Sequence, residues 1–89
     1  MGSRITYYAI VSGGVTVDRP HGLLRRLEHE DGPEDEGIHR DMSWRPTSLI
    51  VEQEHGGTDE DLVEVSHEQA SKIVQYLREK FANEGDSGQ

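Results

Sequence analysis

Residues 62–81 read LVEVSHEQASKIVQYLREKF, and this stretch decides how the rest of the chain is interpreted. Its first four residues are apolar except for one glutamate and include two valines, which is typical of a short strand. Ser66 is followed three residues later by Gln69, the capping-box pattern that predicts a helix directly after the strand. Apolar side chains then recur at helical spacing and predict one buried face, made of Ala70, Ile73, Val74, Leu77 and Phe81.

The N-terminal third supplies two more predicted strands on which that helix can pack. Residues 4–11 are rich in β-branched and aromatic side chains and end at a Ser-Gly-Gly turn signal, so they predict the first strand. Residues 15–17 alternate as a short extension, and residues 23–28 predict a second strand. The side chains expected to face the helix are Tyr7 or Tyr8, Ile10, Leu23 or Leu24, Ile38 and Trp44.

The middle of the chain combines a predicted loop, a predicted strand and one ambiguous segment. Residues 29–36 are acidic and are interrupted by a Gly-Pro pair, which is typical of an exposed loop. Residues 38–44 alternate between apolar and polar side chains, the pattern of a half-buried strand, and a proline ends it soon afterwards. Residues 48–55 favour a strand by side-chain type, but Thr47 before them and a Gly pair after them favour a short helix, which is the preferred interpretation.

These segments together predict an α+β fold, in which a small antiparallel sheet of three to four strands is packed by one C-terminal amphipathic helix. We expect residues 1–82 to form this single small domain and residues 83–89 to form a disordered C-terminal tail. A chain of 89 residues leaves no room for a second domain, and this excludes multidomain enzymes.

Composition narrows the function classes further. The chain has no cysteine, so neither disulfides nor thiolate metal sites are expected. It contains no long apolar run and no signal-peptide pattern, so we expect no contact with membranes and a cytoplasmic location. The formal net charge is −9, yet residues 1–27 carry four arginines and one aspartate. We expect this basic third to pair with the acidic middle across neighbouring strands.

One basic and aromatic patch stands out among the candidate interaction residues. Tyr7 and Tyr8 are expected to lie across a hairpin from Arg25 and Arg26, a combination suited to single-stranded nucleic acid. The strong negative charge of the whole chain opposes such binding, so nucleic acid is disfavoured as a partner. The interaction candidates are Tyr7, Tyr8, Arg25, Arg26, Trp44 and Arg45.

No pattern of residues indicates catalysis or a cofactor. The chain has five histidines, but none is spaced like the ligands of a known metal motif. His39 and Asp41, two apart on one predicted strand face, come nearest to a chelating pair, with His29 as a third candidate across the loop. We assign no catalytic residue and no cofactor.

The sequence therefore favours a small acidic, non-catalytic protein-protein interaction or regulatory module. Two alternatives stay open. One is a nucleic-acid-related regulator, either a single-strand binder through the Tyr/Arg hairpin or an acidic mimic of DNA. The other is a small enzyme or metal-binding protein. Because one helix leaves much of a small sheet uncovered, the expected partner is a protein, with a symmetric homodimer as one form; Ile5, Val11, Leu24 and Ile50 would line its interface.

Overall fold

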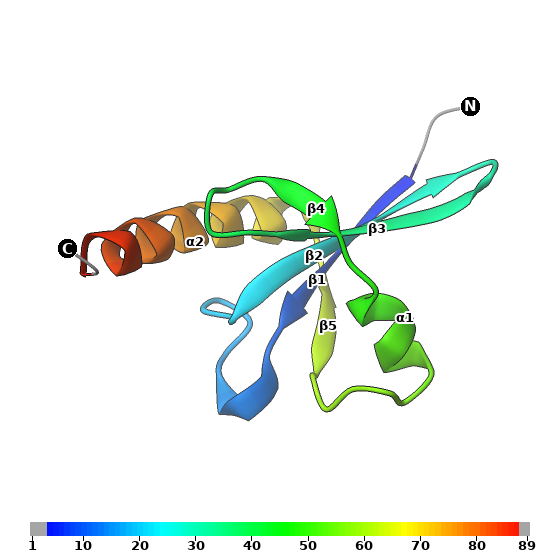
Figure 1. Cartoon of the computed structure of the whole chain (residues 1–89), viewed down its shortest axis with the longest axis horizontal. Helices are drawn as coiled ribbons and strands as arrows, with labels where there is room; N and C mark the ends of the chain where they lie inside the picture. Colours follow the sequence, from blue (N-terminus) through cyan, green and yellow to red (C-terminus); the bar gives the residue numbers. More distant parts are fainter. Residues whose placement is uncertain (1–3, 88–89) are drawn as a thin grey trace.

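The computed structural model describes residues 4–87 and contains a five-stranded antiparallel sheet crossed by one long helix (Figure 1). The elements in chain order are β1 (Arg4–Ile10), the 3₁₀ turn η1 (Ser12–Gly14), β2 (Gly22–His29), β3 (Gly32–Ile38), β4 (Trp44–Pro46), α1 (Leu49–Glu54), β5 (Leu62–Val65) and α2 (His67–Ser87). The strand order is β4-β3-β2-β1-β5, so β4 and β5 form the two edges. The predicted α+β fold class is confirmed, with five strands in place of the three or four expected.

The core lies between α2 and one face of the sheet. Residues directly opposite each other on paired strands share a face, so Ala9 and its partner Leu23 both point towards α2. The buried cluster contains Ala9, Leu23, Val65, Ala70, Ile73 and Leu77. Three of these come from the helix face predicted from the sequence, while Val74 and Phe81 lie at its margin as partly buried side chains.

The opposite face of the sheet is covered in part by α1. Successive side chains of a strand point to opposite faces, and Arg25 points towards α2. Arg26 therefore points to the opposite face, where its guanidinium donates to Glu54 of α1. Leu24 and Ile50 are buried within the single chain, with 4% and 2% of their surface exposed. These two residues were expected at a homodimer interface, but they are already covered inside the monomer, because α1 supplies the second layer that the sequence analysis did not assign.

The beginning of α2 follows the predicted capping pattern. The Ser66 hydroxyl accepts a hydrogen bond from the main-chain N–H of Gln69 at 3.1 Å. The side-chain amide of Gln69 donates to Asp18 at 3.4 Å, so this glutamine ties the helix to the long β1–β2 loop. The strand over residues 62–65 and the helix directly after it are confirmed.

The acidic segment expected to be an exposed loop is a strand, so that prediction is wrong. Residues 30 and 31 form the turn, with Gly32 at a φ of 124°, and β3 begins there. The strand forms because the acidic side chains meet arginines: Glu36 lies opposite Arg25 and Asp35 lies opposite Arg26. The expected pairing of basic and acidic segments is thus confirmed, and it overrides the low strand propensity of Asp, Glu and Gly.

The strand predicted over residues 38–44 is also wrong for most of its length. Ile38 ends β3 and Trp44 begins β4, and the residues between them form a turn closed by a 2.9 Å hydrogen bond from His39 N–H to the Ser43 carbonyl. Met42 adopts a φ of 66°, which an extended strand does not allow. Pro46 is the last residue of β4, so the strand ends at the proline as expected, and an edge strand tolerates proline there.

The ambiguous segment is a helix, α1, as preferred from the sequence. The N-cap is Ser48 rather than the expected Thr47, but the Thr47 hydroxyl accepts from the main-chain N–H of Leu49 at 3.2 Å. The helix ends at Glu54, with His55 as its C-cap, and Gly56 follows with a φ of 72°, which suits glycine. The short strand extension over residues 15–17 is not formed; these residues belong to the loop that joins β1 to β2.

The far end of α2 reaches Ser87, beyond residue 82, where the domain boundary was placed. The last two residues of the expected tail, 88 and 89, lie outside the described residues, as do residues 1–3. No helix in the described part of the chain has the length and apolar character to cross a membrane.

Candidate functional site

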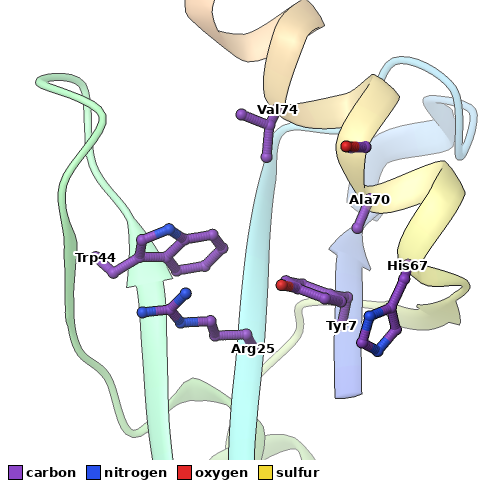
Figure 2. Close-up of a pocket in the computed structure, with 7 residues that line it drawn as sticks. Tyr7, Arg25, Trp44, His67, Ala70 and Val74 are labelled. Carbon is purple, nitrogen blue, oxygen red and sulfur yellow. The ribbon is translucent and has the colours of Figure 1, made fainter. Parts of the chain in front are cut away.

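A groove lies between α2 and the β4 end of the sheet, beside the core (Figure 2). Its hollow has a volume of about 350 Å³. Three strands and one helix line it, through Tyr7 of β1, Arg25 of β2, Trp44 of β4, and His67, Ala70, Ser71 and Val74 of α2. This hollow is called the groove below.

The strand register explains why three of these side chains meet. Tyr7 lies directly opposite Arg25, so both point to the α2 face of the sheet. Arg25 pairs with Glu36 of β3, and Ile38, two residues further along β3, points to the same face as Glu36. Trp44 pairs with Ile38, so its side chain also points to the α2 face of the sheet. The helix supplies the other wall through positions 67, 70, 71 and 74, whose spacing forms one stripe along α2.

The floor of the groove is a stack of rings and one cation. The Arg25 guanidinium carbon lies 4.2 Å from the centre of the Trp44 ring, a cation–π contact. The Tyr7 ring lies between two others: its centre is 6.2 Å from that of Trp44, and 5.1 Å from that of His67 in an edge-to-face arrangement. Figure 2 shows the Tyr7 hydroxyl directed towards the side of the groove where Trp44 and Arg25 lie.

Arg25 is held from one side by a single carboxylate oxygen. Its Nε donates to Glu36 Oε1 at 2.8 Å, and its Nη2 lies 2.7 Å from the same oxygen. The side chains of Arg25 and Glu36 are 23% and 19% exposed, so the pair is partly screened by water. The groove therefore contains a cation that is neutralised but still accessible.

His67 has a structural role at the edge of the groove. Its Nε2 donates to the Ile5 carbonyl at 2.9 Å. The β1–β5 register pairs Tyr7 with Val65, and the same register continued by two residues would pair Ile5 with residue 67. The His67 side chain thus replaces the main-chain hydrogen bond that is lost where the chain leaves β5 for α2. This contact fixes the ring and places its edge against Tyr7.

Of the six interaction candidates, the structure brings together Tyr7, Arg25 and Trp44. Tyr8 and Arg26 lie on the opposite face, because successive side chains of a strand alternate. Arg26 there makes paired hydrogen bonds with Asp35 at 2.8 and 3.1 Å and with Glu54 at 3.1 and 3.4 Å. Burial, together with the negative charge of Glu64, raises the pKa of Tyr8 above its ordinary value.

The sixth candidate, Arg45, lies in β4, and its side chain binds residues of the β3–β4 turn. Its Nη2 donates to Asp41 Oδ2 at 2.7 Å, and its Nε donates to the Ser43 hydroxyl at 3.0 Å. Asp41 Oδ1 accepts from the Ser43 hydroxyl at 2.6 Å and from the Ser43 N–H at 3.0 Å. Hydrogen bonds from Ser43, and then from Arg45, lower the pKa of Asp41 to about 2.

The three candidate metal ligands are not brought together. His29 and His39 lie beyond opposite ends of β3, and His29 lies 3.8 Å from Glu34 at the hairpin end. Both carboxylate oxygens of Asp41 already accept hydrogen bonds. Within residues 4–87, no group of three or more potential ligands is arranged to hold a metal ion.

The basic hairpin patch considered for nucleic acid is divided and neutralised. Arg25 and Arg26 point to opposite faces, and each is paired with at least one carboxylate. A phosphate backbone would have to displace these intramolecular partners before it gained either cation. The arrangement therefore does not favour binding of single-stranded nucleic acid.

The exposed edge of β5 is a second surface feature. The main-chain N–H of Val11 donates to the Asp61 carbonyl at 2.9 Å, so the main-chain groups of Asp61 face β1. In an antiparallel pair this direction alternates along the strand. The main-chain groups of Val63 therefore also face β1, whereas those of Leu62 and Glu64 face away from the sheet. No strand of the described chain pairs with this side of β5. Exposed acidic side chains flank it, at Asp59, Asp61, Glu64 and Glu68. Like charges of this kind oppose edge-to-edge pairing of two copies.

In the helix wall of the groove, the sequence analysis named Ala70 and Val74 as part of the apolar helix face, but it missed His67 and Ser71. The available signal was spacing, because His67 lies three residues before Ala70 on the helix, and Ser71 lies three residues before Val74. Comparison of the chain with protein-family models, with curated proteins and with solved structures found no match.

Proposed function

We propose that the protein is a non-catalytic interaction module, and that it binds a partner protein in the groove between α2 and β4. The observation that carries this proposal is the accessible Tyr7–Trp44–Arg25 stack on the groove floor. Tyrosine, tryptophan and arginine are the residues enriched where protein interfaces gain most of their free energy. A groove of about 350 Å³ with this lining can accept a few side chains from a partner protein.

A catalytic role receives less support from the same residues. The groove contains Ser71 and His67, but the Nε2 of His67 donates to the Ile5 carbonyl. No hydrogen bond joins Ser71 to His67 in the described part of the chain, and no carboxylate orients the ring as in a catalytic triad. The proposal therefore assigns no catalytic residue and no cofactor.

A different protein is preferred over a second copy as the partner. Leu24 and Ile50, two of the four residues expected at a dimer interface, are buried in the monomer, and the acidic β5 edge opposes self-pairing. Sedimentation equilibrium tests this preference. A mass near 10.0 kDa at hundreds of micromolar supports it, and a mass of twice that value would favour the homodimer. We place the module in the cytoplasm, in keeping with a fold that needs no disulfide.

The experiment that tests the proposed function is capture of a partner by matched variants of the immobilised protein. Arg25→Lys keeps the charge but loses the planar fork beside Trp44. Arg45→Lys makes the same chemical change in β4, where the guanidinium binds Asp41 and does not line the groove. A partner that is retained by the parent and by Arg45→Lys but lost by Arg25→Lys supports the groove. Equal retention by all three proteins would contradict it.

A further inference from the structure

Two consecutive arginines of β2 occupy equivalent positions on opposite faces of the sheet. Each lies directly opposite an acidic residue of β3, Arg25 opposite Glu36 and Arg26 opposite Asp35. Each donates through Nε and Nη2 to that acidic partner. The two guanidinium groups therefore differ mainly in what lies on the side that faces away from the β3 carboxylate, which is called the remaining side below.

The remaining side of Arg26 holds a second carboxylate. Its Nη1 donates to one oxygen of Glu54 at 3.1 Å and its Nη2 to the other at 3.4 Å, a second two-point contact. Arg26 thus binds two carboxylates, one from β3 and one from the helix α1 that covers this face. The guanidinium of Arg26 is therefore paired with a carboxylate on both of its sides.

The remaining side of Arg25 has no such partner among residues 4–83, whose side chains the structure describes. Its guanidinium contacts Glu36 and the face of Trp44, and it lines the groove. The helix on this face, α2, presents Ala70, Ser71 and Val74 to the groove and no acidic side chain. The position beside Arg25 that corresponds to the position of Glu54 beside Arg26 therefore lies in the open groove.

The other groups around this space suit an anion with an apolar neighbour. The Tyr7 hydroxyl is directed towards it in Figure 2, and Ser71 provides a second hydroxyl in the lining. Val74 and Ala70 form an apolar wall above the rings. A cationic ligand is excluded from the Trp44 face that Arg25 covers, because Arg25 already makes the cation–π contact there.

We infer that the groove binds a carboxylate of the partner protein, with its charge on the open side of Arg25 and an adjoining apolar side chain against Val74. This inference rests on the proposed function, because it names the chemistry of the segment that the groove accepts. A planar guanidinium fork matches a carboxylate with two parallel hydrogen bonds. The carboxylate plays the part that Glu54 plays for Arg26.

The test uses small probes and the single tryptophan of the chain. N-acetyl-leucine and its uncharged carboxamide are titrated while the indole N–H resonance of Trp44 is followed by NMR. The titrations are run at about 0.15 M salt, where the Debye length of about 8 Å limits repulsion from the net charge of −9. An amide-capped Leu-Glu-Leu tripeptide and its Leu-Gln-Leu analogue distinguish a side-chain carboxylate from a chain-terminal one.

We expect at least one carboxylate probe to bind about tenfold more tightly than its amide partner, as a charge-assisted hydrogen-bonded pair implies. Arg25→Gln should abolish this preference, and Arg25→Lys should retain part of it. Glu36→Gln should strengthen carboxylate binding several-fold, because it removes the competing carboxylate. The control Glu34→Gln removes the same charge two residues along β3 and should leave the preference unchanged.

Opposite effects of Arg25→Gln and Glu36→Gln separate binding from stability, since loss of structure would weaken binding in both variants. Equal binding of acid and amide, or no shift of the Trp44 resonance with either, would overturn the carboxylate assignment. So would tighter binding of inorganic phosphate than of either carboxylate probe. None of these outcomes depends on whether Arg25→Lys abolishes partner capture, so the proposed function stands or falls separately.

Discussion

Leu77→Ala is the substitution that tests the packing of α2 on the sheet most severely. Leu77 is fully enclosed, with 0% of its surface exposed. The change removes three carbon atoms, and at about 0.8 kcal/mol per buried carbon this costs about 2.4 kcal/mol of unfolding free energy. Ala9 and Ala70 belong to the same buried cluster and have no rotamers with which to fill the cavity. A cavity contribution therefore brings the expected loss to about 3 to 4 kcal/mol.

The measurement is urea unfolding followed by the fluorescence of Trp44, the only tryptophan. A domain of 89 residues has a total stability of about 4 to 13 kcal/mol, so this loss is about a quarter of the total at the upper end of that range and nearly all of it at the lower end. Val63→Ala is the matched control, because Val63 is 39% exposed on the edge strand and should lose less than about 1 kcal/mol. A loss below about 0.5 kcal/mol for Leu77→Ala would refute the packing of α2 described above.

Substitutions at three further positions test separate parts of the structure. Gly37→Ala should cost about 1 kcal/mol in the same unfolding assay, since the new methyl group would lie 2.9 Å from Leu24 Cδ2 and the buried leucine would have to shift; an unchanged midpoint would contradict this contact. Ser66→Ala should lose about 1 kcal/mol through the missing cap to Gln69, whereas Ser66→Asp should keep most of it. The pKa of Asp41 is depressed to about 2 from its ordinary 3.8, so its contribution is present above about pH 4 and is lost as the pH falls towards 2. The stability difference between the parent and Asp41→Asn should therefore shrink over that range, and a difference that is constant from pH 5 to 2 would count against the depressed pKa.

The elements that were predicted correctly are those in which local patterns agree with tertiary packing. Residues 62–81 combine strand propensity, a capping serine and a helical apolar stripe, and all three indicate the same structure. The strand over residues 4–11 and the hairpin partner over residues 23–28 have β-branched, aromatic or leucine side chains that the core requires. In these segments the local signal alone was sufficient.

The acidic strand β3 was not predictable from its own residues. Glu34, Asp35 and Glu36 are poor strand formers, and they become a strand only because β2 presents two arginines in register. Arg25 and Arg26 were recognised as neighbours of the tyrosines, but their carboxylate partners were assigned to a loop. A search for basic residues in one segment that would lie opposite acidic residues in the next, if the two formed a hairpin, would have indicated this pairing.

The candidate site was predictable only in part for a related reason. Tyr7, Arg25 and Trp44 were all named as interaction residues, but the groove also needs α2 as its second wall. Alternation along β1 and β2 then separates Tyr8 and Arg26 from them. The face on which each side chain lies depends on the register, which a single strand pattern does not define.

The account rests most heavily on the claim that a protein partner occupies the groove at Trp44, and fluorine NMR of the protein labelled with 5-fluorotryptophan tests this claim most directly. The chain has a single tryptophan, so a single resonance reports on the groove floor. We predict that a partner captured in an Arg25-dependent manner shifts or broadens this resonance in proportion to the bound fraction measured by sedimentation. A partner that binds fully while the Trp44 resonance keeps its position and width would contradict the account.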